Sequence, residues 1–443
     1  IMLIEFTVAN YCSFRAPATL SMLAANLKSK DDRIDHNNVF RVQGQPSLLT
    51  SAVLYGRNAS GKSNLVAAIA FMRSFVLNSF RATTEDFGGI DVEPFRLHTA
   101  TLHQPSTFEI VFLLENTRYR YGFEATPERI VAEWLYQAPK SAEALLFRRE
   151  QQSVKVGRSF KEAHDRIQFM RPNSLFLSTL AGANAHLAQK LLKWFRRINT
   201  ASGINDIGMR IYTLQQMIEG RNIDVISKFM TALDTGIEGI NVEKRKREDT
   251  PAFPTGMPEN IRSAITVLLN DPNSEQVSVR TMHTVYDEQG HAIGRTEFDI
   301  DEQESEGTRK LFALAGPVSA ALAEGRLLII DEFDARLHPL LTRQIIQLFN
   351  DPATNPHHAQ LIAVTHDTDL LDNHLMRRDQ IWFVEKDSKG SSTLYSLAEF
   401  KGVRNDKDYE RGYIEGRYGA VPFVNGLAEA INQYEVEDGA ASE

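Results

Sequence analysis

The feature that most restricts the fold of this chain is a glycine-rich segment between an apolar run and a helical pattern. Residues 52–54, Ala-Val-Leu, are typical of a buried strand, and residues 56–63 follow as Gly-Arg-Asn-Ala-Ser-Gly-Lys-Ser. A helix is expected from Gly61 to about Phe80. Because a glycine-rich turn between a strand and a helix directs backbone amides and a helix N-terminus at an anion, the segment predicts a phosphate-binding loop.

Each position of this loop has an expected role. Lys62 is expected to reach the outer phosphates of a nucleotide, and the hydroxyl of Ser63 is expected to ligate magnesium. The remaining contacts are expected from the other loop residues and the residue after them, which are Gly56, Asn58, Ala59, Ser60, Gly61 and Asn64. The loop alone does not distinguish a kinase, a GTPase and an ATPase.

A second motif favours an ATPase. Residues 327–330 are four consecutive apolar residues, typical of a buried strand, and Asp331 and Glu332 follow them. This placement brings Asp331 to the magnesium shell and lets Glu332 polarise the attacking water. His366 follows a further apolar strand, at 361–365, and is a candidate contact to the terminal phosphate. The sequence therefore predicts binding of ATP with Mg²⁺ and hydrolysis by Glu332 and His366.

The patterns of strands and helices divide the chain into three regions. Alternating segments at 107–114, 119–124 and 130–136 predict an antiparallel lobe within residues 1–160, which also carry strands at 2–8 and 51–55. Helical periodicity from 161 to about 270 predicts a helical insertion, 161–275. Within residues 276–443 we expect strands at 276–286, 296–300, 327–330, 361–365 and 380–385, and helices at 307–324, 335–349 and 368–374. This alternation predicts a mainly parallel sheet covered by helices, so the fold class is α/β.

Composition restricts the compartment and the partners. Cys12 is the single cysteine, which excludes an intramolecular disulfide framework and a cysteine-ligated zinc site. No apolar stretch reaches the length of a membrane span, and Glu5 interrupts the opening segment, so a cytoplasmic protein without a membrane partner is expected. A net charge of -8 argues against a nucleic-acid coat. Basic clusters at 190–197 and 244–247 are either solvated surface or contacts to DNA phosphates.

Together the motifs resemble the ABC-type ATPases, in the branch that holds the SMC, RecF and overcoming-lysogenisation-defect proteins. The Gly-x-Asn-x-Ser-Gly-Lys-Ser-Asn form of residues 56–64 is typical of that branch. The resemblance implies an ABC-type ATPase head in which Asp331 and Glu332 form the Walker B pair and His366 is the switch histidine. It also implies that residues 335–339 form the loop that crosses a dimer.

The same resemblance implies a site shared between two copies. In ABC-type ATPases, ATP lies between the phosphate loop of one subunit and a signature helix of another. At the corresponding place, residues 304–310 read Glu-Ser-Glu-Gly-Thr-Arg-Lys, which keeps a serine and a glycine but lacks the second glycine of the family's signature. We therefore expect a head-to-tail homodimer or larger homo-oligomer in which Ser305 and Gly307 close the partner's site.

Four further segments look like the RloA/AbiL-type ATPases of bacterial abortive-infection and other anti-phage systems: 2–14, 20–25, 305–310 and 413–420. This likeness implies a nucleotide-dependent switch or sensor that controls a separately encoded effector, often a TOPRIM-like nuclease, with DNA or a phage protein as the trigger. About sixty residues follow Glu385, too few for a typical nuclease domain, so an effector is expected to come from another chain. Two alternatives stay open: a RecF/SMC-like DNA-repair ATPase that acts on DNA, and a scaffold that keeps its nucleotide without hydrolysis.

Overall fold

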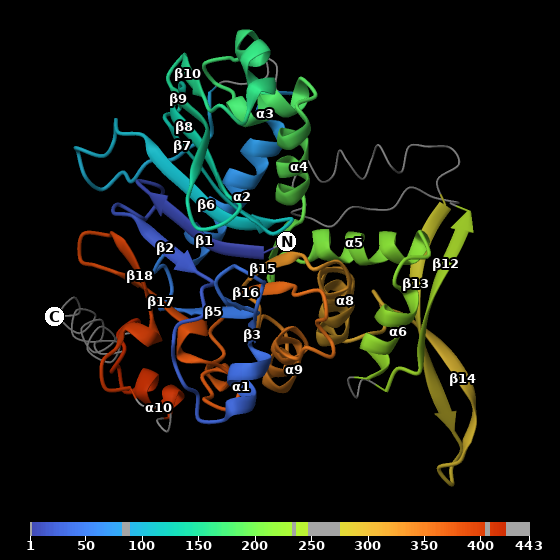
Figure 1. The fold of residues 1–443 in the computed structure, drawn as a ribbon. Coiled ribbons are helices and arrows are strands. Elements are labelled where there is room, and N and C mark those ends of the chain that lie inside the picture. The colour runs from blue at the N-terminus through green and yellow to red at the C-terminus, as the bar shows by residue number, and fades with distance from the viewer. Residues whose placement is uncertain (1, 82–88, 233–235, 247–274, 404–407, 422–443) are drawn as a thin grey trace, which may run out of the picture. The chain divides into compact units, whose positions relative to one another are not determined.

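The computed structural model describes residues 2–81, 89–232, 236–246, 275–403 and 408–421 (Figure 1). Its contacts divide the chain into unit 1, which holds residues 1–200, 325–333 and 343–443, and unit 2, which holds residues 201–324 and 334–342. This division differs from the three expected regions, because the first helices of the expected insertion belong to unit 1. Helices α3 (Phe176–Gly182) and α4 (His186–Phe195) bury apolar side chains such as Leu180 and Trp194 in the core of that unit.

Unit 1 contains a seven-stranded sheet in the order β10-β9-β8-β7-β6-β1-β2. All of its strand pairs are antiparallel. Alternate residues of β6 are buried, as expected for a strand with one face on the core. The antiparallel lobe is therefore confirmed, and its strands are β1 (Met2–Ala9), β2 (Ala18–Ser21), β6 (Ser106–Leu114), β7 (Thr117–Ala125), β8 (Ile130–Ala138), β9 (Ala144–Glu150) and β10 (Ser153–Val156).

The second large sheet of unit 1 has the order β11-β15-β16-β5-β17-β18. Strand β5 (Ser51–Tyr55) is fully buried and pairs in parallel with β16 (Gln360–Val364) and with β17 (Ile381–Lys386). Strand β15 (Leu327–Asp331) is parallel to β16, and β18 (Ser392–Ser396) is antiparallel to β17. The expected mainly parallel sheet and the α/β fold class are thus confirmed. Strand β11 (Ile198–Ser202) and β18 are edge strands that the sequence patterns did not predict.

Helix α2 (Lys62–Asn78) follows the glycine-rich loop, and it buries Leu65, Ile69, Met72 and Val76 along one face. Two expected helices differ from those observed. Helix α9 (Pro339–Asn350) begins four residues later than expected, because Arg336 has a φ of 64° and Pro339 suits a first helical position. Residues 368–374 contain only the 3-10 turn η2 (Thr368–Leu370). The other short elements of unit 1 are α1 (Asp32–Asn37), β3 (Val39–Phe40), β4 (Leu48–Leu49), η1 (Lys161–Phe169), η3 (Arg378–Gln380), η4 (Leu397–Glu399) and α10 (Tyr409–Ile414).

Unit 2 combines helices α5 (Ile207–Ile218), α6 (Ile223–Thr231) and α8 (Glu306–Glu324) with an antiparallel sheet of β12 (Gly239–Lys246), β13 (Glu275–Tyr286) and β14 (Ala292–Asp299). Strand β12 lies where only helices were expected, and residues 247–274 of the expected insertion lie outside the described residues. Pro317 interrupts the hydrogen bonds of α8, because it has no amide to donate to Ala313. The hydroxyl of Thr213 on α5 donates to Ala313 O instead, at 3.0 Å, and accepts from Gly316 N at 3.1 Å. Among the residues that the structure describes, every helix is too short or too polar to span a lipid bilayer.

Candidate functional site

Three neighbouring parallel strands of unit 1 bring the sequence motifs to one edge of the sheet. Strand β5 leads into the phosphate loop, β15 ends at Asp331 and leads to Glu332, and β16 leads to His366. Carboxyl ends of parallel strands meet at the same edge, where open α/β sheets bind their ligands. A pocket of about 450 Å³ lies here and is lined by Asn58, Ala59, Ser60, Gly61, Lys62, Ser63, Asn64, Glu332, His366 and Lys386.

The glycines of the loop are required by its close packing. A Cβ at Gly56 would lie 2.4 Å from the carbonyl oxygen of Val384, and one at Gly61 would lie 2.4 Å from Ser392 Oγ. Gly61 also has a φ of 112°, and Ala59 has a φ of 62°, so the backbone turns through conformations that L side chains rarely adopt. Successive amides in such a turn form an anion-binding concavity in front of α2.

Two polar side chains of the loop fit a phosphate ligand. Lys62 is 5% exposed, and its Nζ donates to Gly56 O at 2.7 Å and to Arg57 O at 3.3 Å, which holds the ammonium against the loop. The buried Ser60 hydroxyl has no hydrogen-bond partner in the described residues. Because a buried polar group without a partner is costly, a bound anion would stabilise this arrangement.

Residues outside the loop hold it in place. Ser392 Oγ on β18 donates to Ser60 O at 2.5 Å, and its backbone amide donates to Ser13 O at 2.7 Å. Asn64 Nδ2 donates to Ser13 Oγ at 2.8 Å. The sequence patterns gave no role to Ser13 or Ser392, because a serine is common in loops and only the fold brings these two to the phosphate loop.

The acidic turn after β15 has an unusual backbone. Glu332 has a φ of 52°, a conformation that strains a residue other than glycine, and it lines the pocket. The turn is fixed by Phe333 N, which donates to Val364 O of β16 at 2.8 Å, and by Glu332 N, which donates to Asp331 Oδ1 at 3.1 Å. Asp331 stands beside the pocket lining, not in it.

The residues present suit magnesium bound together with a nucleotide. The described residues contain no group of three His, Cys, Asp or Glu side chains that could hold a metal by themselves. Magnesium usually takes one or two protein ligands and completes its shell with phosphates and water. Asp331 and Ser63, at the carboxyl end of β15 and the start of α2, offer the carboxylate and hydroxyl oxygens for such a site.

His366 occupies a short segment that is tied to the central strand. Thr365 N donates to Leu54 O at 3.1 Å, and the Tyr55 hydroxyl donates to Asp367 O at 2.9 Å. His366 itself is exposed and lines the pocket. The contacts on both sides therefore position the imidazole at the pocket.

Ser305 and Gly307 lie in unit 2, at the start of α8, and are not among the residues that line the pocket of unit 1. Ser305 Oγ accepts from Thr308 N at 3.1 Å, which is the geometry of a helix N-cap. Their role in a site shared between two copies stays a prediction.

A family model described as "AAA domain, putative AbiEii toxin, Type IV TA system" matches residues 51–372. The chain belongs to this family. The match spans β5, the phosphate loop, Asp331, Glu332 and His366, so the chain carries a P-loop ATPase domain of the AAA type. Among solved structures, the SMC head domain from Thermotoga maritima is similar, with 14% identity, a TM-score of 0.38, and coverage of 89% of this chain and 99% of that chain. A search of curated proteins finds no match.

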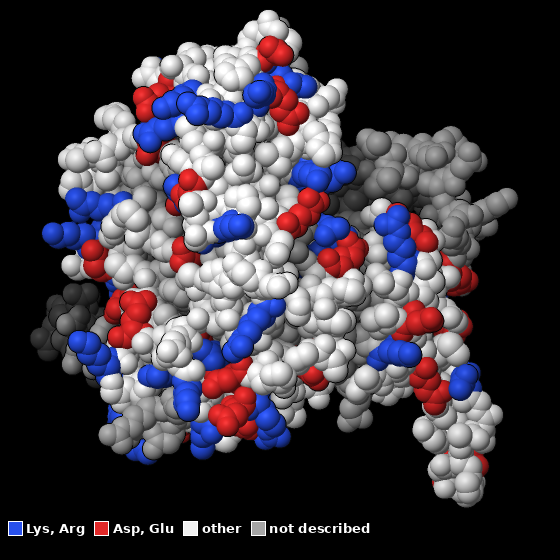
Figure 2. Space-filling model, viewed as in Figure 1, with Lys and Arg blue, Asp and Glu red and all other residues white. Residues whose placement is uncertain are grey.

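The basic cluster at 190–197 covers the second half of the amphipathic helix α4 and the two residues after it, Arg196 and Arg197. Leu191, Leu192, Trp194 and Phe195 are buried, while Lys190 Nζ pairs with Glu115 at 2.9 Å. On the face displayed in Figure 2, basic side chains are interspersed with acidic ones. The buried apolar side chains and the pair of Lys190 with Glu115 favour the solvated-surface interpretation of this cluster. Residues 244–246 lie in β12, and Arg247 lies outside the described residues.

Proposed function

We propose that this chain is a magnesium-dependent ATPase that acts as a nucleotide-dependent switch in a bacterial abortive-infection system. The observation that carries the ATPase proposal is the convergence of Lys62, Glu332 and His366 on one pocket at the carboxyl edge of the sheet. The description of the family, which names a putative AbiEii toxin of a type IV system, supports the defence setting. We propose that the chain is of the RloA/AbiL type.

Each side chain then has a role. Lys62 and the loop amides would bind the phosphates, and Ser63 and Asp331 would hold magnesium, which would neutralise phosphate charge. Glu332 orients and polarises the attacking water, and the strained turn that follows β15 holds Glu332 in place. His366 contacts the terminal phosphate.

The site is proposed to be complete only in a pair of copies. Ser305 and the amides at the start of α8 would face the phosphates bound to the partner, because a helix N-terminus favours an anion. ATP binding then joins two copies, and hydrolysis releases them. The difference between the joined and released states is the signal passed to the effector.

Two substitutions test the ATPase proposal. Lys62→Ala is expected to lose ATP binding, whereas Glu332→Gln is expected to bind ATP and to release phosphate about 10²–10⁴-fold more slowly. ATP binding is measured by calorimetry and turnover by phosphate release. Unchanged turnover in the Glu332→Gln protein would remove this residue from the role of base.

A mixing experiment tests the shared site. Neither Ser305→Ala nor Lys62→Ala alone should hydrolyse ATP at the normal rate, but a mixture of the two should regain one intact site in each mixed pair. Failure of the mixture to recover activity, together with a monomer that ATP does not convert to a dimer, would contradict the shared site.

The effector is tested with the product of the adjacent gene, for which a TOPRIM-like nuclease is our candidate. We expect it to co-purify with this chain and to bind the ATP and ADP states with different affinities. DNA binding by the isolated chain that weakens steeply with salt would favour the RecF/SMC-like DNA-repair alternative instead. ATP retained without phosphate release would favour the scaffold.

A further inference from the structure

A second lysine lines the nucleotide pocket and belongs to none of the motifs. Lys386 is the last residue of β17, the parallel neighbour of the strand that leads into the phosphate loop. It is half-buried, and the pocket lining places it with Lys62, Glu332 and His366. The lining therefore carries two ammonium groups and one carboxylate, a balance that suits an anionic ligand.

The backbone around Lys386 is in direct contact with the phosphate loop. Arg57 Nη2 donates to Lys386 O at 2.6 Å, and the carbonyl of Val384 is the atom that a Cβ at Gly56 would meet at 2.4 Å. Ser392, which pairs with Lys386 in the β17–β18 register, donates to Ser60 O at 2.5 Å. The β17–β18 hairpin thus touches the loop at three points, which fixes the position of the Lys386 backbone beside it.

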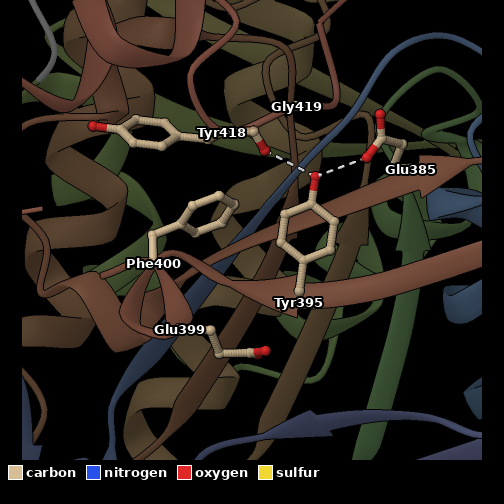
Figure 3. A pocket seen from close by; sticks show the side chains of 6 residues that line it. All are labelled: Glu385, Tyr395, Glu399, Phe400, Tyr418 and Gly419. Carbon is tan, nitrogen blue, oxygen red and sulfur yellow. Dashed lines mark hydrogen bonds between the residues drawn. The ribbon is translucent and has the colours of Figure 1, made fainter. Parts of the chain in front are cut away.

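The neighbouring residue lies in a separate hollow. Glu385 lines a hollow of about 330 Å³ together with Tyr395, Glu399, Phe400, Tyr418 and Gly419. Figure 3 shows the Tyr395 hydroxyl between Glu385 Oε2, at 3.2 Å, and Tyr418 O, at 2.8 Å. A Cβ at Gly419, whose φ is 68°, would lie 2.7 Å from that hydroxyl, so the segment 413–420 packs closely against this side of β17.

This packing separates the two charges on β17. Successive side chains of a strand point to opposite faces, so Glu385 turned toward Tyr395 leaves Lys386 turned toward the nucleotide pocket. The Tyr395 hydroxyl and the close backbone of Gly419 hold the carboxylate in its own hollow. The segment 413–420, which the nucleotide motifs do not include, therefore packs on the face of β17 opposite Lys386.

We propose that Lys386 is a second phosphate-binding cation of the nucleotide site, supplied by β17 and not by the phosphate loop. The inference rests on the proposed ATP site. Lys62 is bound close to the carbonyls of Gly56 and Arg57, whereas Lys386 approaches the pocket from the adjoining strand. Two ammonium groups on different elements contact a triphosphate from two directions, and each adds a charge-assisted hydrogen bond.

The test compares Lys386→Met, Lys386→Arg and Lys389→Met in the full chain. Methionine keeps most of the length of the side chain and removes the charge, and Lys389 is an exposed lysine of the same hairpin. Calorimetry with ATP and magnesium is expected to show binding at least tenfold weaker for Lys386→Met, about 1.4 kcal/mol. Lys386→Arg should stay within about threefold of the wild type and Lys389→Met within about twofold. The difference in ATP affinity between the wild type and Lys386→Met should become smaller as the salt concentration is raised.

The outcomes separate this inference from the proposed function. Lys386→Met that binds ATP within twofold of the wild type, while Lys62→Met loses binding, overturns the role of Lys386 and leaves the ATP site standing. Normal ATP binding by both proteins overturns the ATP site itself. An unchanged melting temperature without nucleotide shows that Lys386→Met is folded. ATP binding by Lys386→Arg that is as weak as that of Lys386→Met also overturns a role for the charge.

Discussion

Gly307→Ala is expected to stabilise the folded chain and to weaken the pairing of two copies by ATP. Gly307 is the second residue of α8, and it is not among the described residues with positive φ. A Cβ there would lie 3.5 Å from Arg336 O and 3.7 Å from Ser305 Oγ, which are ordinary contact distances. The fold of a single copy therefore accepts alanine at this position.

The two effects have different magnitudes and opposite signs. Alanine at a compatible helical position reduces the entropy of the unfolded chain, and the free energy of unfolding should rise by about 0.4–1 kcal/mol. In the proposed shared site, the same methyl group would occupy space next to the helix N-terminus that the partner's phosphate needs. Overpacking of this kind costs about 1–3 kcal/mol, so the ATP-dependent dimerisation constant should fall by about 5- to 150-fold.

Gly208→Ala is the matched control. Gly208 is the second residue of α5, also in unit 2, and a Cβ there would meet nothing within 4 Å. Both variants are measured by thermal unfolding and by sedimentation with ATP, in a Glu332→Gln background that retains the nucleotide. We expect both to gain stability and only Gly307→Ala to lose dimerisation. Equal dimerisation by the two variants would refute the role of Gly307 in a shared site, and an unfolded Gly307→Ala protein would refute the geometry from which its stability is argued.

Two further predictions concern buried charges. Glu133→Ala removes a fully buried carboxylate that accepts hydrogen bonds from two backbone amides at the start of α3 and lies 3.5 Å from the buried Arg149. The free energy of unfolding should therefore fall by about 3–5 kcal/mol, measured by urea unfolding with tryptophan fluorescence. Glu143→Ala breaks a shorter but more exposed ion pair, with Arg120 at 2.7 Å, and should lower the free energy of unfolding by less than about 1 kcal/mol. Equal losses in the two variants would contradict this ranking. Burial lowers the pKa of Lys310 from 10.5 to about 8, so the unfolded chain binds more protons between these values and stability should rise with pH there. Lys310→Met should remove that rise, which is followed as the melting temperature from pH 8 to pH 10, and a rise of the same size in the variant would show that other groups cause it.

The elements of the fold that the sequence predicted depend on local patterns. Strand β5 has the expected bounds, 51–55, and α2 begins one residue after the expected start, because an apolar run, a glycine-rich turn and a helical pattern are all contained in one short segment. Strand β15 was predicted from its four apolar residues for the same reason. Since parallel strands end at one edge, these local predictions were sufficient to bring Glu332 and His366 to the phosphate loop.

The elements that the sequence patterns missed either depend on partners that are distant in the chain or lack an apolar strand pattern of their own. Strand β12 carries a basic run, lies at the edge of its sheet, and pairs with β13 across residues 247–274. Strand β18 is a short, largely polar edge strand. Lys386 and Ser392 reach the phosphate loop only because β17 lies beside β5, and nothing in the residues near 386 indicates that neighbour.

The two halves of the proposed shared site differ in how strongly the contacts within a single copy determine their conformation. On the phosphate side, Ala59 and Glu332 both have positive φ, and Gly61 has no room for a side chain. Such strain persists only where surrounding contacts enforce it, so this half is already arranged for phosphate before a partner binds. On the signature side, Gly307 has a relaxed backbone and room for a methyl group at ordinary contact distance from Arg336 O, and Ser305 caps its own helix. If a partner's phosphate approaches Gly307, as we propose, a glycine that its own fold does not need leaves room for that phosphate. Closure of the pair, and not assembly of the phosphate loop, would then be the step that ATP controls.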